Sequence, residues 1–212
     1  MERLINVKAV IFDCDGVLFD SKQANIRFYN SIRAHFGLPP MSKEEEDYVH
    51  VHTAYESVKY IFRNFPHLQD VAQKYRVEKD YSPFIKYMKM EPGLRELLKK
   101  LKSAGLGLAV ATNRSNTIGP VLEHFGLNGF FDIVISSLDV KNVKPHPESL
   151  YKILDFFRIS NREAVYVGDS EVDYKMAKAG GVIFIAYKNR SLDADYHIER
   201  LPQIADLLLP FN

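Results

Sequence analysis

The sequence predicts an α/β fold: an open parallel sheet with helices on both faces and a small all-helical domain inserted after the first strand. Three observations support this prediction. Short apolar runs alternate with amphipathic helical patterns along most of the chain. These runs are nearly continuous in Val, Ile, Ala and Phe, which is typical of strands covered on both sides. One long stretch after the first run contains no strand pattern.

Five apolar runs predict the strands of the sheet. They are residues 9–12, 106–112, 132–136, 164–169 and 182–187. Residues 93–105 form an amphipathic helical pattern that stops at Gly105. Residues 147–160 form another, with Pro147 at a plausible first helical position. Alternating strands and helices with right-handed crossovers would build an open, Rossmann-like sheet.

The interruption of this pattern runs from about Ser21 to Met90. It is dense in aromatic residues and shows no convincing strand. We therefore predict a helical domain of residues 21–90, inserted into a core of residues 1–20 and 91–212. The alternative is a long crossover whose extra helices pack on the sheet. The acidic run of residues 43–47 predicts a solvated helix start.

Composition limits the classes of partner. The 212 residues include 28 Lys and Arg against 27 Asp and Glu, a net charge of +1, so no nucleic acid or membrane partner is expected. No apolar run approaches the roughly 20 residues needed to cross a bilayer, and the first ten residues lack the apolar core of a signal peptide. The single cysteine, Cys14, excludes a disulfide framework and fits a reducing compartment. A cytoplasmic protein is predicted.

Polar side chains follow four of the predicted strands, at the edge where open α/β sheets bind their ligands. Each of them alone could be an ordinary turn or helix cap. Their arrival at one edge from four strands instead predicts a functional site. They are Asp13 and Asp15 after the first strand, Thr112, Asn113 and Arg114 after the second, Lys144 after the third, and Asp169 and Asp173 after the fourth.

The charge of this set indicates what it holds. Four carboxylates and one lysine would not all stay ionised unaided, because like charges raise each other's pKa. A hard divalent cation with oxygen ligands resolves this, and Mg²⁺ suits a site with few carboxylates and room for water and phosphate. A phosphate dianion would then be bound by the metal, by Lys144 and by backbone N–H groups.

Four motifs resemble those of the haloacid dehalogenase superfamily, in the expected order and spacing. They are DCDGV (13–17), ATN (111–113), KPHPE (144–148) and GDSEVD (168–173). The resemblance covers the whole chain, with residues 21–90 in the place of the family's helical cap. It implies a phosphoric monoester hydrolase acting on a small phosphorylated metabolite, and at the subfamily level it points to phosphoglycolate phosphatases.

The resemblance also implies roles for the acidic residues. Asp13 would be the nucleophile that forms an aspartyl-phosphate. Asp15, facing the same way, would protonate the leaving alcohol and later activate water, so one of the pair would be ionised while the other carries a proton. Mg²⁺ would bind Asp13, the backbone carbonyl of Asp15 and Asp169. Asp173 would orient Lys144 or a metal-bound water.

Substrate binding falls to the remaining motif residues. The Thr112 hydroxyl and the backbone N–H of Asn113 would hold the phosphoryl oxygens, and Lys144 would neutralise charge that develops on phosphorus. The small residues Ala177 and Gly180, on one helix face with Asp173, would let that helix pack closely on the sheet.

Three alternatives to a phosphatase are considered. Dehalogenases and phosphonate-cleaving relatives lack an aspartate at the position of Asp15. A catalytically silent regulatory protein would not need every motif residue for turnover, yet all are present. A sugar-phosphate mutase of the β-phosphoglucomutase type would place a histidine where this chain has Asn25, and two adjacent acids at the start of the fourth motif where this chain reads GDSEVD. Both differences favour hydrolysis.

Three other residues invite a functional interpretation. Cys14 should point into the core, opposite to its aspartate neighbours, as a small apolar filler. His50 and His52 would diverge if both lay on one helix, which favours a surface or cap-closing role over a metal site. His146 is expected to belong to a helix start.

Overall fold

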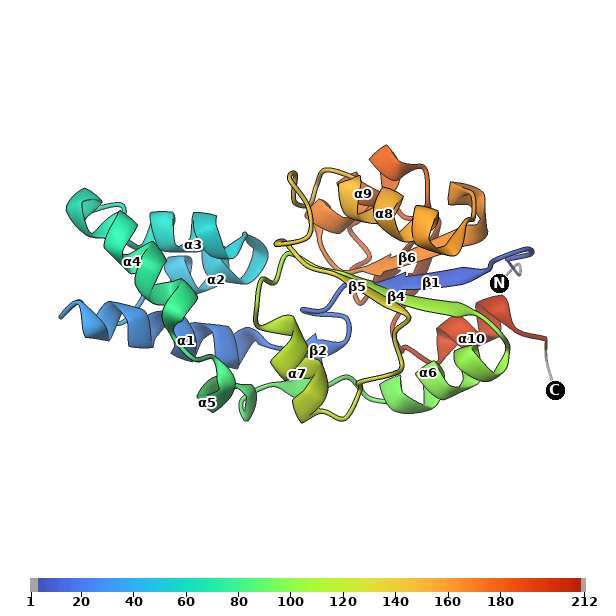
Figure 1. Ribbon diagram of the computed structural model, residues 1–212, viewed down its shortest axis with the longest axis horizontal. Coiled ribbons are helices and arrows are strands. Elements are labelled where there is room, and N and C mark those ends of the chain that lie inside the picture. Colours follow the sequence, from blue (N-terminus) through green and yellow to red (C-terminus); the bar gives the residue numbers. More distant parts are fainter. Residues whose placement is uncertain (1–3, 211–212) are drawn as a thin grey trace.

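The computed structural model describes residues 4–210, which form a six-stranded parallel sheet with a lobe of helices beside it (Figure 1). The spatial order of the strands is β5-β4-β1-β6-β7-β8, so the order reverses at the central strand, where such sheets place their ligands. The strands are β1 (Ala9–Phe12), β4 (Gly107–Ala111), β5 (Ile133–Ile135), β6 (Ala164–Gly168), β7 (Ile183–Tyr187) and β8 (Tyr196–Ile198).

The five predicted strands are confirmed, with ends that differ by at most one residue. The edge strand β8 was not predicted. It has three residues, and only Ile198 is buried, so the sequence carries no apolar run there. Within residues 4–210, no helix combines the length and apolar character that crossing a membrane requires.

Side chains of each strand alternate between two layers of helices. Val10 and Phe12 of β1 belong to the core under α6 (Leu94–Ser103) and α10 (Gln203–Leu208). Ile11 belongs to the core under the opposite helices, which are α8 (Glu148–Phe157) and α9 (Glu171–Gly180). Figure 1 shows these pairs on either side of the sheet. A short helix, α7 (Ile118–His124), follows β4, and a 3₁₀ turn (Asn161–Glu163) precedes β6.

The predicted helix ends agree with the structure in part. After α6 the chain passes through Gly105, whose φ of +80° lies in the left-handed region, as a helix stop requires. Pro147 precedes α8 as its cap instead of starting it, and α8 ends without glycine because Arg158 takes the left-handed conformation, with φ +55°.

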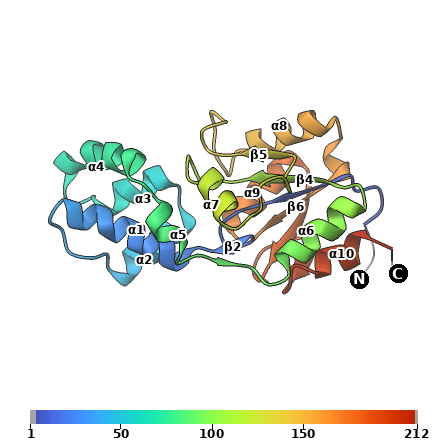
Figure 2. The ribbon, with the colours of Figure 1, turned by 60° about the horizontal axis from the view of Figure 1, so that its bottom comes forward.

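The helices between β1 and α6 gather at one end of the molecule, away from both termini (Figures 1 and 2). They are α1 (Lys22–His35), α2 (Lys43–Val51), α3 (Ala54–Ile61), α4 (Pro66–Glu78) and α5 (Ser82–Ile85). We call residues 21–90 the helical insertion. They lie beside the sheet, an arrangement that favours an inserted domain over helices packed along the faces of the sheet. The division of the chain into a core and a separately folding cap stays a prediction.

A two-stranded antiparallel ribbon joins the helical insertion to the sheet. It consists of β2 (Phe19–Asp20) and β3 (Lys89–Met90), with Phe19 opposite Met90. The expectation that the stretch from about Ser21 to Met90 contains no strand is therefore wrong, because β3 lies at its end. Two-residue strands carry no periodicity from which they could be read.

The acidic run at the start of α2 is only partly solvated. Ser42 and Glu45 form a reciprocal capping box, which fixes the beginning of the helix. Glu45, however, is buried, and its carboxylate accepts hydrogen bonds from Arg33 at 3.1 Å and Arg63 at 2.7 Å. A residue expected in solvent is thus the centre of an ion-pair cluster within the helical insertion.

Candidate active site

A cavity of about 130 Å³ lies where the carboxyl ends of the strands meet the helical insertion. Both parts of the chain line it. The predicted site residues that border it are Asp13, Asp15, Thr112, Asn113, Lys144 and Asp169. Asp173 lies behind them, fully buried. The structure therefore brings all seven predicted residues to one place; the roles assigned to them stay predictions.

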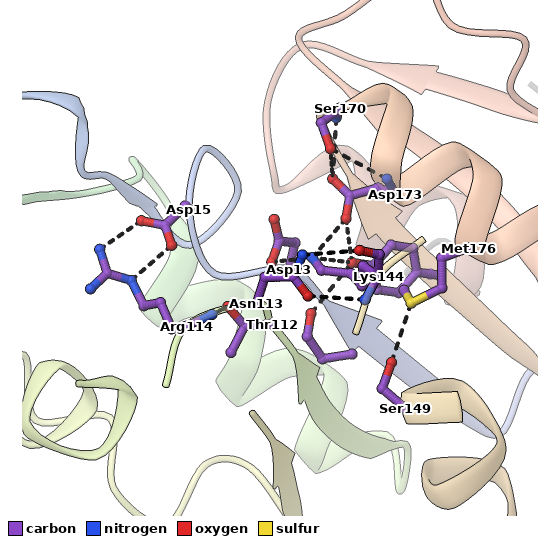
Figure 3. Close-up of polar contacts among 12 residues, drawn as sticks. Asp13, Asp15, Thr112, Asn113, Arg114, Lys144, Ser149, Ser170, Asp173 and Met176 are labelled. Carbon is purple, nitrogen blue, oxygen red and sulfur yellow. Dashed lines mark hydrogen bonds and ion pairs between the residues drawn. The ribbon is translucent and has the colours of Figure 1, made fainter. Parts of the chain in front are cut away.

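Lys144 is the electrostatic centre of the cluster (Figure 3). Its Nζ lies 2.7 Å from a carboxylate oxygen of Asp13 and 2.8 Å from one of Asp173, and it also donates to the Tyr166 hydroxyl at 3.2 Å. Burial lowers the pKa of Lys144, but the two carboxylates raise it more, and the net shift is upward. Lys144 is therefore a fixed cation beside Asp13.

Asp173 has no free carboxylate oxygen. One oxygen accepts from Lys144 and from the Tyr166 hydroxyl at 2.7 Å; the other accepts from the Ser170 hydroxyl at 2.6 Å and its backbone N–H at 3.2 Å (Figure 3). Burial raises the pKa of Asp173, but Lys144 and these hydrogen bonds lower it more. This arrangement supports an orienting role for Asp173 over direct ligation of a metal.

In two other carboxyl groups of the cavity, Asp13 and Asp169, burial outweighs the nearby positive charge, and the pKa is raised. Burial raises the pKa of Asp13 well above its usual value, although Lys144 acts in the opposite direction. Burial, together with the charge of Asp173, raises the pKa of Asp169 to about 7. Oxygens of Asp13, Asp169 and Asp173 lie within 4.8 Å of one another, so a divalent cation could join the first two and relieve their repulsion.

The loop after β1 is shaped to approach this acidic pair. Gly16 has φ +80°, and a Cβ at this position would lie 2.0 Å from a carboxylate oxygen of Asp169. Only glycine lets the backbone beside Asp15 come this close. The residues present therefore fit a Mg²⁺ ion held by Asp13, Asp169 and the Asp15 carbonyl.

Asp15 borders the same cavity as Asp13, but its carboxylate is paired with a cation that the sequence reading had not assigned to it. Its carboxylate turns to Arg114, whose Nε and a terminal nitrogen donate at 2.8 and 2.7 Å (Figure 3). The hydroxyl of Ser21 also donates to it. Burial raises the pKa of Asp15, but the Arg114 charge and these hydrogen bonds lower it more, and the net shift is downward. The predicted acid is thus held as an anion.

Arg114 was noted in the sequence without a role, and it is a second cation of the site. It is buried, so the four carboxylates face two cations in place of one. The signal for it was its position directly after Asn113 at a strand end. The ion pair between Arg114 and Asp15 joins residues far apart in the sequence, so neither the DCDGV motif nor the ATN motif predicts it.

The loop after β4 connects Thr112 and Asn113 to Lys144. The Asn113 amide group donates to the Lys144 carbonyl at 3.2 Å, and its oxygen accepts from the Lys144 N–H at 3.0 Å. The Thr112 hydroxyl accepts from the Arg114 N–H at 3.1 Å. The side chain of Asn113 therefore positions Lys144, a function that the sequence did not indicate.

Glycines set two close approaches in the fourth motif. A Cβ on Gly168 would lie 2.4 Å from the Cβ of Asp173, so glycine is needed for the start of α9 to pack against the strand end. Gly180 instead packs on α8, since a Cβ there would lie 2.8 Å from a methyl group of Leu150. The prediction that Gly180 faces the sheet is wrong.

Two of the other singled-out residues behave as expected. Cys14 is fully buried. The ring of His146 accepts a hydrogen bond from the Glu148 N–H at 3.2 Å, so it belongs to the start of α8.

Two histidines of the helical insertion, His50 and His52, border the cavity. Because α2 ends at Val51, they do not share a helix, and the geometry assumed for them was wrong. His52 stacks on Tyr48, with ring centroids 3.7 Å apart. Nδ1 of His50 is buried and has no hydrogen-bond partner among the described residues.

Comparison with known proteins gives consistent relatives. Residues 10–187 match the model of the family described as haloacid dehalogenase-like hydrolase. The chain is 29% identical to a phosphoglycolate phosphatase of Chromobacterium violaceum, over 97% of this chain and 98% of that protein. It is 25% identical to pyrophosphatase PpaX of Halalkalibacterium halodurans, over 96% and 98%.

A solved structure extends the similarity to three dimensions. It is a HAD-superfamily hydrolase of subfamily IA from Geobacter sulfurreducens, 42% identical, with a TM-score of 0.85. The match covers 95% of this chain and 100% of that one. The similarity therefore includes the helical insertion as well as the sheet.

Proposed function

The chain belongs to the haloacid dehalogenase-like hydrolase family, and from this premise we propose that it is a Mg²⁺-dependent phosphatase of small phosphorylated metabolites. Phosphatases are among its full-length relatives. The observation that carries the proposal is the placement of Asp13, between Lys144 at 2.7 Å and the acidic group of Asp169, at the floor of a cavity. A nucleophilic carboxylate, a fixed cation and a set of metal ligands are what phosphoryl transfer requires.

In the proposed reaction a carboxylate oxygen of Asp13 attacks phosphorus, and the bond to the leaving alcohol breaks. The alcohol oxygen takes a proton from Asp15, and an aspartyl-phosphate remains. Water then attacks this phosphorus and gives its proton to Asp15, which releases phosphate and restores Asp13. The Thr112 hydroxyl and the Asn113 N–H would hold the phosphoryl oxygens, and Lys144 would balance their charge.

The ion pair with Arg114 adds a condition to this scheme. An aspartate whose pKa is lowered by a guanidinium is a poor acid. Asp15 must therefore leave Arg114 before it can protonate the alcohol. A substrate that binds Arg114 would displace the Asp15 carboxylate from it. Attack of Asp13 on phosphorus would then follow substrate binding.

The proposed metal would be held by the Asp13 and Asp169 carboxylates and the Asp15 carbonyl. When bound, it would neutralise the phosphoryl oxygens and keep Asp13 ionised. Asp173 would contribute by holding Lys144 in place. This agrees with the raised pKa values of Asp13 and Asp169, which mark a site that needs a further positive charge.

Hydrolysis is favoured over the mutase reaction by the environment of Asn25. Its amide oxygen accepts from the Tyr81 hydroxyl at 2.7 Å and lies 3.4 Å from a terminal nitrogen of Arg114. An amide in this position cannot titrate near neutral pH as an imidazole does. We further propose that residues 21–90 act as a cap over the site, and that the protein works in the cytoplasm.

The test is a screen of phosphomonoesters with Mg²⁺, followed by two variants. Wild type should release phosphate, EDTA should stop it and Mg²⁺ should restore it. Asp13→Asn should abolish turnover, because a neutral amide is a poor nucleophile. Asp155→Asn, an exposed change on α8, should have no effect. Undiminished turnover by Asp13→Asn, or full activity in EDTA, would contradict the proposal. Rapid isomerisation of β-glucose 1-phosphate with no phosphate release from any monoester would favour the mutase.

A further inference from the structure

The helical insertion lines one end of the cavity, and one arginine at that end, Arg76, has no counterion among residues 4–210. Arg76, on α4, is half-buried and lines the cavity. Its Nε donates to the Gln73 side chain at 3.2 Å. Within residues 4–210, no group accepts a hydrogen bond from its two terminal nitrogens and no carboxylate forms an ion pair with it.

The other cations of the cavity differ in this respect. Lys144 is paired with Asp13 and Asp173, and Arg114 with Asp15. Burial lowers the pKa of Arg76, and only the hydroxyl of Tyr29 acts in the opposite direction. A guanidinium nevertheless stays protonated in proteins, so a partly desolvated charge remains uncompensated. An anion bound in the cavity would compensate it.

His50 supplies a second unsatisfied group at the same end. Its buried Nδ1 has no partner among the described residues, and the ring borders the cavity. Burial lowers the pKa of His50, although Asp15 acts against the shift, so the ring is neutral at neutral pH and can donate one hydrogen bond. Arg76 and the His50 ring therefore both border the part of the cavity that the helical insertion lines.

We propose that Arg76, assisted by His50, binds a second anionic group of the substrate. The substrate is then a short phosphomonoester with a carboxylate or a second phosphate at its other end. The proposal rests on the proposed function for the identity of the phosphate end. The cavity of about 130 Å³ is smaller than the roughly 300–1,000 Å³ of typical ligand pockets, which fits a compact substrate with two anionic groups.

Binding of non-hydrolysable phosphonates tests the subsite without relying on turnover. Phosphonopropionate carries a carboxylate at its far end, propylphosphonate carries a methyl group there, and ethylenediphosphonate carries a second phosphonate. By calorimetry with Mg²⁺, wild type should bind at least one of the two compounds that carry a second anionic group about ten- to a hundred-fold more tightly than propylphosphonate. The tighter of the two identifies the second group.

Substitutions on α4 then test whether Arg76 causes this preference. Arg76→Gln should remove the preference while leaving propylphosphonate binding unchanged, and Arg76→Lys should keep part of it. Lys74→Gln is the matched control, because Lys74 is exposed on the same helix. Thermal unfolding verifies that each variant is folded. Equal binding of all three compounds by wild type, or equal weakening of all three by Arg76→Gln, would overturn the subsite.

The same compounds separate this inference from the proposed function. If wild type hydrolyses phosphomonoesters but does not discriminate among the phosphonates, the phosphatase stands and the subsite falls. If it discriminates through Arg76 but hydrolyses no phosphomonoester, the subsite stands and the phosphatase falls.

Discussion

At the scale of single residues, Asp13 and Asp15 have pKa values shifted in opposite directions. Burial raises that of Asp13, whereas Arg114 outweighs burial and lowers that of Asp15. The proposed reaction needs the reverse, with Asp13 ionised and Asp15 protonated. Two events would supply these protonation states: binding of a cation beside Asp13 and release of Asp15 from Arg114. Catalysis by the proposed mechanism would therefore depend on both the metal and the substrate.

Asp15→Asn should slow hydrolysis of an alkyl phosphate by about 10²–10⁴-fold, the usual range for loss of a general acid. The loss should be much smaller for the first step with p-nitrophenyl phosphate, whose leaving group needs no proton. Burst kinetics with both substrates measure this difference. An equal loss with both substrates would show that Asp15 does not act as the acid.

The sequence predicted which residues gather at the site, because their positions follow from the strands. It did not predict the contacts among their side chains, because these depend on side-chain direction. Asp13, Thr112, Lys144 and Asp169 follow strands, and parallel strands bring their carboxyl ends together whatever the details of packing. The bonds of Arg114 to Asp15 and of Asn113 to Lys144 form between loops far apart in sequence. Their geometry depends on rotamers that no motif spacing specifies.

At the scale of elements, α2 is held by charge as well as by apolar contacts. Arg33 of α1 is buried and donates to Glu45 of α2 and to two backbone carbonyls, of Pro39 and Ile61. This cluster fixes the helix that leads to His50 in the cavity. Loss of the cluster should therefore affect both stability and the distal end of the site.

Glu45→Gln should lower the free energy of unfolding by about 1.5–3 kcal/mol, the range for hydrogen bonds to charged groups. Burial raises the pKa of Glu45, but the Ser42 backbone, Arg63 and Arg33 lower it more. With the folded pKa lowered, the stabilisation is present above the pKa of an unfolded glutamate and is lost as pH falls through the folded value. Denaturation at pH 7 and at pH 3 should show a difference between Glu45→Gln and wild type that is smaller in acid.

Glu46→Gln is the control for this change. Glu46 neighbours Glu45 on α2, but among residues 4–210 its carboxylate pairs only with the exposed Lys43, so its loss should cost less than about 1 kcal/mol. A Glu45 variant as stable as the Glu46 variant would show that the buried cluster contributes little. The acidic run of residues 43–47 did not reveal that Glu45 is buried and Glu46 is not. Which of the five residues is buried depends on how α1 and α3 pack against α2.

The elements themselves were predictable in proportion to their length and periodicity. The apolar strands and the amphipathic α6 and α8 were read correctly. The edge strand β8 was not, because only one of its residues is buried and the sequence carries no apolar run there. The ribbon of β2 and β3 was not, because two-residue strands form no pattern and their pairing depends on distant partners.

At the scale of the whole molecule, the proposed metal would tie together two ends of the chain. Asp13 follows the first strand of the sheet and Asp169 follows β6. Without a cation, the raised pKa values of both carboxyl groups mean that their ionisation opposes folding. Stability should then decrease as pH rises from about 4, the usual pKa of an unfolded aspartate, to the value of about 7 for Asp169.

Mg²⁺ at about a hundred times its dissociation constant should raise the Tm at pH 8 by about 5–10 °C, and EDTA should reverse this. Asp169→Asn should respond little to Mg²⁺ and, in EDTA at pH 8, should be more stable than wild type. Scanning calorimetry at pH 5 and pH 8 measures both effects. A Tm of wild type that is independent of Mg²⁺ would contradict the proposed ligands.

The central position of β1 has a consequence for how the chain folds during translation. Its two neighbours, β4 and β6, both lie in the second half of the chain. The first strand to leave the ribosome therefore stays unpaired while the helical insertion, whose contacts are local, can already form. We expect the apolar segment AVIF to need protection from aggregation until β4 and β6 emerge. Asp13 reaches its partners only then, so the onset of activity should coincide with the last step of folding.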